Sequence, residues 1–346
     1  MTNGGGHRNL RLQPRDIAIF RGLFESRLAT LEQLAALYFD DRYDAAAKRV
    51  QLLKHAGFLT DRRLSVGERS VPYLTKRGYD QLAASGNVDG FPRLSAKQFS
   101  RRVQVRPLTV AHELQVMDVR MALTHAINAS RAFTIEEFTT WPLLSRFPAR
   151  HPTTARKLIV QPDGFLRVRE LDTGRTHSFF LELDRSTEVQ RRLAERALCY
   201  RQFYMTGGFA ARCGARADQL RQHPFRVLFV LQNAERRNNT AERLMNCSPP
   251  VKSQAWLTTL PELLADPLGA IWVAPLDYHY ATQGTEYEPR RRPNVRQYAR
   301  RPQREQLVEK RVAKRTLLPS AHLLVNESAA PTANDDPVSG PPSIAA

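Results

Sequence analysis

The 346-residue sequence has no apolar run that approaches the roughly 18–20 residues needed to cross a membrane. Its first residues, MTNGGGHRNLRLQPRD, also lack the apolar core of a signal peptide. Neither a membrane span nor a secretory leader is therefore predicted. The expected location is the cytoplasm, with no membrane partner.

Cysteine is scarce, with Cys199, Cys213 and Cys247 as its only occurrences. Three widely spaced cysteines form neither a zinc-binding pattern nor a disulfide framework. They are expected to be reduced, partly buried thiols. The sequence also lacks the internal repeats that build solenoids.

Positive charge is abundant. The chain has 52 Lys and Arg against 34 Asp and Glu, which gives a formal net charge of +18 and a pI of about 10.4. Such an excess favours a polyanionic partner. Because no membrane segment is predicted, double-stranded DNA is the expected partner.

The first part of the chain has the pattern of three helices followed by a hairpin. Pro14 opens the first helical pattern, Thr30 and Gln33 form a capping box for the second, and Asp44 is expected to cap the third. Gly57 can end that third helix. A β-hairpin is expected over 58–75, with a short helix after it. This order predicts a winged helix-turn-helix over residues 12–84, followed by a linker over 85–107.

In a winged helix the third helix enters the major groove. The side chains expected to contact DNA from it are Lys48, Arg49, Gln51 and Lys54. The wing would add Arg62, Arg63 and Arg69 at phosphate or in the minor groove. The alternative is an interaction module whose basic side chains are only solvated.

The second part predicts an α/β domain over residues 108–280. A long helix from Thr109 is followed by strands, a Pro- and Arg-rich loop over 142–157, and further helices and strands in the order α-β-β-β-α-β-α-β. This order indicates a mixed sheet flanked by helices. Residues 281–346 are expected to be a basic, largely disordered tail, because 290–315 contain eleven Lys and Arg against two Glu.

Acidic residues stand at the ends of two predicted strands. Glu182 and Asp184 are two apart, so they face the same side of a strand, and a hairpin can bring Asp163 beside them. Such a cluster suits a hard divalent cation, and Mg²⁺ is the expected ion. In the alternative interpretation, these carboxylates form structural ion pairs and Asp163 is only the turn residue of Pro-Asp-Gly.

Four sequence segments together resemble the replication-relaxation family, whose members are implicated in replication and relaxation of plasmid and mobile-element DNA. The segments are LQPRDIAIFRGL to LLKHAGFL, then YLTKRGYDQL, then HELQVMDVRMAL, and finally PDG followed by FFLELDRSTE and YRQFY. FRVLFVLQNAERR is similar to the family's next strand and helix. The resemblance covers roughly residues 12–275 and rests on the order of the motifs.

The second domain is also similar in pattern to restriction-endonuclease-like folds. In that resemblance Asp163 matches the Asp of the PD motif, Glu182 matches the acid of the next strand, and Glu113 is the helical acid; these three would hold Mg²⁺. Asp184 stands where the pattern has Lys, which puts cleavage in doubt. Arg185 is a candidate for the missing cation, although Arg is a poor proton acceptor.

Three functions remain open at this point. The first is a DNA-binding accessory protein in replication, relaxation or mobilisation, which would work with other proteins of that process. The second is a metal-dependent nicking endonuclease that uses Asp163 and Glu182. The third is a winged-helix transcriptional regulator that dimerises. A phosphotyrosine mechanism through Tyr200 or Tyr204 is less favoured, because the sequence lacks the histidine cluster of relaxases.

Overall fold

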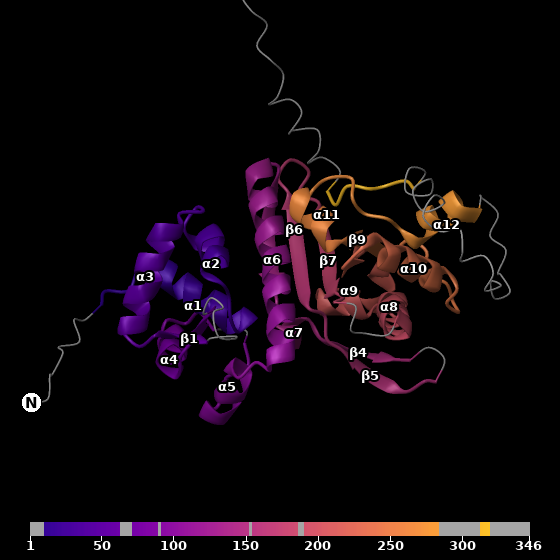
Figure 1. Cartoon of the computed structure of the whole chain (residues 1–346). Coiled ribbons are helices and arrows are strands. Elements are labelled where there is room, and N and C mark those ends of the chain that lie inside the picture. The colour runs from indigo at the N-terminus through magenta and orange to yellow at the C-terminus, as the bar shows by residue number, and fades with distance from the viewer. Residues whose placement is uncertain are drawn as a thin grey trace, which may run out of the picture.

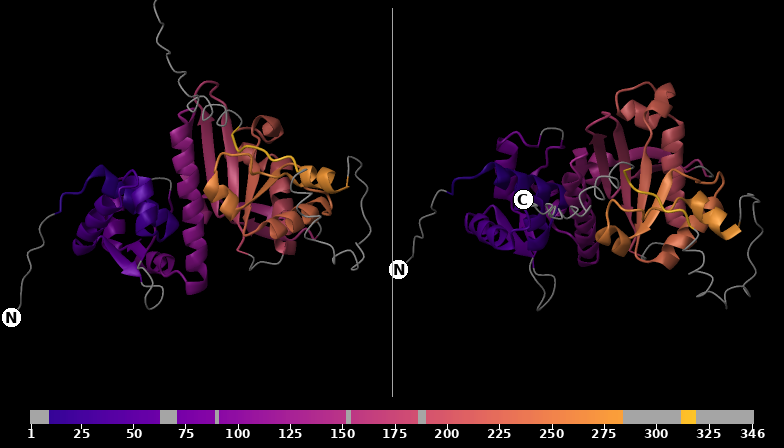
Figure 2. Two further views of the ribbon diagram at one scale, coloured as in Figure 1. Left: turned by 45° about the horizontal axis from the view of Figure 1, so that its top comes forward. Right: turned by 90° about the horizontal axis from the view of Figure 1, so that it is seen from above.

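The computed structural model describes residues 10–62, 71–88, 91–151, 154–185, 190–283 and 312–318. Among them a long helix, α6 (Pro107–Ser130), stands between an N-terminal helical unit and a mixed sheet (Figure 1, Figure 2). The combination of helices and sheet confirms the predicted α/β class.

The N-terminal unit packs helices around a small antiparallel sheet. Its helices are α1 (Pro14–Ser26), α2 (Leu31–Tyr38), α3 (Tyr43–His55), α4 (Lys76–Ala84) and α5 (Ala96–Val103), and its strands are β1 (Leu59–Arg62) and β2 (Val71–Leu74). Helix α5 lies within the segment expected to be a linker. This segment is packed onto the unit, because Phe99 buries its ring against Tyr79 of α4. Three helices followed by an antiparallel hairpin are the order that the sequence predicts.

Local signals fix two of these helix ends as expected. The Thr30 hydroxyl accepts a hydrogen bond from the Gln33 amide at 3.2 Å, and the Gln33 side chain accepts one from the Thr30 amide at 2.9 Å. Gly57 follows α3 with a φ of +75°, a conformation that favours glycine. Asp44 does not cap α3, because the helix begins one residue earlier and its N-cap is Arg42.

Helix α6 joins the N-terminal unit to the rest of the molecule. The Gln33 side chain of α2 donates hydrogen bonds to the Leu114 carbonyl at 2.9 Å and to the Asp118 carboxylate at 2.6 Å. Elsewhere between the halves, the Arg102 guanidinium of α5 lies 4.1 Å from the centre of a Trp141 ring. The two halves are therefore packed through specific polar and aromatic contacts.

The main sheet has the strand order β3-β6-β7-β8-β9. Its strands are β3 (Phe133–Thr139), β6 (Gly164–Glu170), β7 (Thr176–Leu183), β8 (Arg226–Leu231) and β9 (Ala255–Thr259). The pairs β3–β6 and β6–β7 are antiparallel, and β7–β8 and β8–β9 are parallel. The start of β6 and the end of β7 therefore lie at the same end of the strands, with Gly164 opposite Leu181. We call this end of the strands the edge of the sheet.

Helices cover both faces of this sheet (Figure 1). Side chains of α8 (Gln190–Met205), α9 (Gly208–Arg212) and α10 (Ala234–Met245) pack with Phe180 on one face. Side chains of α6 and α11 (Leu260–Ala265) pack with Phe179 and Leu181 on the other. The near-continuous apolar character of the central strands follows from this double burial. The remaining helices are α7 (Pro142–Ser145), η1 (Ala217–Gln222) and α12 (Pro275–Gln283).

Two segments differ from the expected structure. The loop expected over 142–157 contains strand β4 (Phe147–Arg150), which pairs antiparallel with β5 (Lys157–Val160) as a two-stranded ribbon. Phe147 and Val160 pack this ribbon onto α8, which supplies the burial that a lone hairpin lacks. The last strand of the predicted order, over 270–276, is reduced to two single bridges, Val273 with Leu257 and Trp272 with Arg315, since α12 begins at Pro275.

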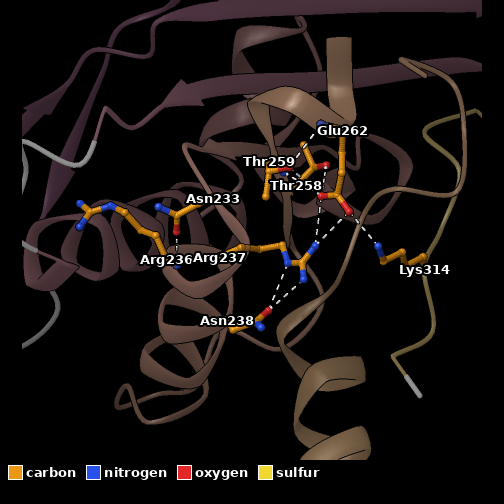
Figure 3. Close-up of polar contacts among 8 residues, drawn as sticks. All are labelled: Asn233, Arg236, Arg237, Asn238, Thr258, Thr259, Glu262 and Lys314. Atoms are coloured by element: carbon orange, nitrogen blue, oxygen red, sulfur yellow. Dashed lines mark hydrogen bonds and ion pairs between the residues drawn. The ribbon is translucent and has the colours of Figure 1, made fainter. Parts of the chain in front are cut away.

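The described end of the chain, which we call the C-terminal strap (residues 312–318), crosses the second half of the molecule. Leu317 and Leu318 are buried in the core that α6 and α11 share. Arg315 forms two hydrogen bonds of 2.7 Å with Asp277. Lys314 donates to Glu262 at 2.8 Å (Figure 3). This part of the basic tail therefore departs from the expected disorder. In the described residues, no helix is long and apolar enough to span a membrane.

Candidate functional site

The exposed face of α3 offers polar groups to a partner. Lys48 and Gln51 are both exposed on it. Tyr43 and Leu52 lie near them, with 44% and 48% of their surface accessible. Such a mixture of cationic, amide and apolar side chains can contact phosphate, base edges and thymine methyl groups.

Three of the other expected DNA contacts are engaged within the protein. Arg49 turns inward and binds both carboxylate oxygens of Asp16, which is completely buried in α1. Lys54 pairs with Asp61 at 2.7 Å. Arg62 donates to the Val105 carbonyl. The last two of the expected contacts, Arg63 and Arg69, lie outside the described residues.

The carboxylates expected at the end of the strands do meet at one edge of the sheet. The Asp163 amide donates to the Leu181 carbonyl at 3.0 Å, and the Leu183 amide donates to the Asp163 carboxylate at 2.8 Å. Asp163 thus lies beside Glu182, as the hairpin predicts. Its own charge contributes to raising the pKa of Glu182.

Asp163 forms a hydrogen-bonded pair with His112 of α6, whose Nε2 lies 3.0 Å from the carboxylate. Burial alone would raise the pKa of Asp163, but the His112 hydrogen bond and charge lower it below its ordinary value. Burial opposes charging of His112 as well, yet Asp163 raises the imidazole pKa above its ordinary value. The pair's stabilisation is therefore lost as pH falls through the carboxyl pKa, or rises through the imidazole pKa.

Glu182 is buried and held by two side chains of α8. The Tyr200 hydroxyl donates to its carboxylate at 2.5 Å, and the Arg196 guanidinium pairs with it. Burial raises its pKa to about 7 despite Arg196. Burial and the Glu182 charge also raise the pKa of Tyr200 well above 10, so Tyr200 is a buried hydrogen-bond donor and a poor nucleophile.

Asp184 faces the same side as Glu182 but pairs with a different helix. Its carboxylate binds Arg236 of α10. Asn233 caps α10 by accepting from the Arg236 amide at 2.9 Å. The side chains of Arg236 and Arg237 extend in opposite directions from this helix (Figure 3). Arg185 is half-buried, and its charge acts on His112.

Glu113 is directed toward the N-terminal unit. Its carboxylate lies 3.3 Å from Arg27. Burial raises the pKa of Glu113, although Arg27 opposes the shift. This acid therefore belongs to the contact between the two halves.

These carboxylates do not fit a Mg²⁺ site as they are arranged here. The oxygens of Asp163, Glu182 and Asp184 each accept hydrogen bonds from protein donors, and two of these acids are paired with arginine. In the part of the chain that the structure describes, no three His, Cys, Asp or Glu side chains group as metal ligands. A hard cation needs oxygen ligands whose lone pairs are available.

Two important residues escaped the sequence patterns. Arg236 pairs with Asp184, which is 52 positions away. Lys314 donates to Glu262, which also accepts from the buried Arg237 (Figure 3). The cap at Asn233 was a visible signal for the start of α10. Nothing local in the sequence specifies these pairings.

The structure thus defines a helical unit with an exposed polar helix face, joined to a mixed-sheet domain with a carboxylate edge. A family model described as replication-relaxation matches residues 20–216, which is more than half of the chain. The chain belongs to the replication-relaxation family, as its motif order predicts. This membership associates it with plasmid or mobile-element replication or relaxation. Comparison with curated proteins and with solved structures finds no match.

Proposed function

We propose that this protein is a DNA-binding accessory in the replication, relaxation or mobilisation of a plasmid or other mobile element. In this proposal the N-terminal unit is a winged helix-turn-helix, and α3 enters the major groove of duplex DNA. The observation that carries the proposal is the exposed pair Lys48 and Gln51 on the third helix of a chain with a net charge of +18. The β1–β2 hairpin after α3 occupies the position of a wing.

Replacing Lys48 with Ala is expected to weaken duplex binding and to reduce the slope of log K against log salt by about one, because one phosphate contact is lost. Gln51→Ala is expected to relax preference for one base position in a randomised duplex library. Fluorescence anisotropy between about 50 and 200 mM salt measures the first effect. The matched control is Arg175→Ala, which removes one exposed charge from the β6–β7 turn. Equal slopes for both variants would contradict the role of α3.

Metal-dependent nicking remains a second candidate, because Asp163 and Glu182 share the sheet edge where restriction-endonuclease-like folds cut DNA. We nevertheless expect no cleavage. Arg196 and Tyr200 hold Glu182, and Asp184 stands where that pattern has lysine. In this arrangement protein donors hold the carboxylates of Asp163, Glu182 and Asp184 in a structural network.

Incubation of supercoiled plasmid with the protein is therefore expected to retard the plasmid without converting it to open circle. The test uses Mg²⁺, Mn²⁺ or chelator, with the Asp163→Ala/Glu182→Ala variant beside the wild type. Conversion that requires metal and is lost in the variant would establish the nuclease instead. A regulator would show a stable dimer on a palindromic site, which the same binding experiments would detect.

A further inference from the structure

The β4–β5 ribbon carries a concentration of positive charge that the function proposed for α3 does not use. Four of its side chains are exposed: Arg146 just before β4, Arg150 at its end, Arg156 before β5, and Lys157 at its start. The sequence from 138 to 162 contains no Asp or Glu. Figure 1 shows the ribbon extending from the body of the second half, below α8.

These four cations have no hydrogen bond or ion pair from their side chains to any described residue. Other arginines around the sheet behave differently: Arg196, Arg236 and Arg315 each pair with an acid. On the ribbon, His151 is the group that approaches an acid, at 3.9 Å from Glu195. The charge of the ribbon is therefore directed to solvent rather than to the fold.

The strand register places like charges against each other. Arg150 is directly opposite Lys157, and Pro148 is opposite Ile159. Directly opposed like charges destabilise an antiparallel pair, so this arrangement has a cost in the isolated protein. A polyanion lying along the ribbon would turn that repulsion into attraction.

The surface between these charges suits the backbone of a nucleic acid. Ile159 is 60% exposed beside Pro148. A hollow of about 380 Å³ separates the ribbon from the end of α8, and its lining contains Gln202 and Thr206 but no acidic residue. Apolar side chains between cations can contact sugars while the cations contact flanking phosphates.

The ribbon also leads directly to the carboxylate edge. β5 ends three residues before Asp163, and Arg196, which holds Glu182, donates to the Gln161 carbonyl at 2.9 Å. A duplex bound on the ribbon would thus lie close to this edge. A two-stranded ribbon has dimensions that a DNA groove admits.

We propose that the β4–β5 ribbon is a second duplex-DNA contact, in which Arg146, Arg150, Arg156 and Lys157 bind backbone phosphates. The proposal rests on the DNA binding proposed for this protein but not on the contact through α3. It assigns sequence-independent binding of DNA phosphates to the second half of the chain.

The test compares Arg150→Gln/Lys157→Gln with wild type in the full chain. Loss of two phosphate contacts is expected to weaken duplex binding about tenfold or more near physiological salt, and to reduce the salt slope by about two. The variant is expected to keep or raise its melting temperature, because a like-charge pair is removed. A lower melting temperature without loss of binding would overturn the proposal by making these residues structural.

A matched control removes the same charge from another hairpin. Arg169→Gln/Arg175→Gln alters two exposed arginines of the β6–β7 hairpin; Arg169 pairs with Glu136 at 3.1 Å, and Arg175 lies near Glu170. This control is expected to bind duplex nearly as wild type does. Equal loss in both double variants would reduce the effect to net charge and overturn the ribbon contact.

Three further comparisons separate the ways in which the proposal can fail. If wild type does not bind duplex at all, the proposed function and the ribbon contact both fail. If Lys48→Ala weakens binding but the ribbon variant does not, the ribbon contact alone fails. The third comparison uses vesicles that contain an anionic lipid. If only the ribbon variant loses vesicle binding while its duplex binding is unchanged, the ribbon contacts a membrane surface instead of DNA.

Discussion

Replacing Arg49 with Ala is expected to lower the free energy of unfolding by about 3–5 kcal/mol. The sequence places Arg49 among the DNA contacts, but its guanidinium holds the carboxylate of Asp16, which is 0% exposed. Without Arg49 that carboxylate would remain buried and charged, with the Gln13 amide donating to it at 2.7 Å. Denaturant unfolding monitored by circular dichroism measures the loss.

The neighbouring residue provides a control for the Arg49 prediction. Lys48→Ala removes an exposed charge one position away and is expected to change stability by no more than about 0.5 kcal/mol. The double variant Asp16→Asn/Arg49→Gln removes both charges and is expected to recover much of the loss, since no unpaired buried charge remains. If Arg49→Ala is as stable as Lys48→Ala, the buried pair does not hold the helices together.

The second large effect concerns pH. Because burial raises the pKa of Glu182 to about 7, against an ordinary value of 4.5, the folded protein keeps a proton that the unfolded chain releases. Stability contributed by this group therefore falls as pH rises from about 4.5 to 7, by about 3 kcal/mol in total. The Glu182→Gln variant cannot lose that proton. Its stability relative to wild type is expected to rise by about 3 kcal/mol between about pH 5 and 8.

Glu262→Gln is the matched control for the pH experiment. Although burial acts the other way, hydrogen bonds from Lys314 and Thr259 lower the pKa of Glu262, so its titration lies below that window. Its difference from wild type should stay constant over the same range. Asp163, Arg196 and Tyr200 surround Glu182, and they are unchanged in both variants. A constant difference for Glu182→Gln as well would mean that Glu182 is ionised in the folded protein throughout.

The sequence allowed much of the fold to be predicted where the signals are local. The Thr30–Gln33 capping box sets the start of α2, and Gly57 follows α3 in the conformation that glycine favours. The position of Asp163 beside Glu182 follows from the period of a strand and a hairpin, and both are local. The family follows from the order of its motifs.

Partners distant in the sequence could not be predicted in the same way. Lys48 and Arg49 look equivalent in the sequence, but their orientation on α3 exposes one and turns the other to a helix 33 residues earlier. The β4–β5 ribbon lies in a Pro- and Arg-rich segment whose burial depends on α8. The carboxylates at the sheet edge looked available as ligands because their arginine partners come from two later helices.

Helix α6 has a consequence for how the molecule unfolds. It contributes Met117 to the core of the N-terminal unit, and Val116 and Val119 to the core of the sheet, where Leu318 of the C-terminal strap also packs. Each half therefore completes its interior with residues of one shared helix. Cutting the chain near residue 107, the boundary suggested by the sequence, would leave α6 with the sheet but would remove Met117 from the interior of the N-terminal unit and expose it to solvent. We therefore expect the two halves to unfold in one cooperative transition.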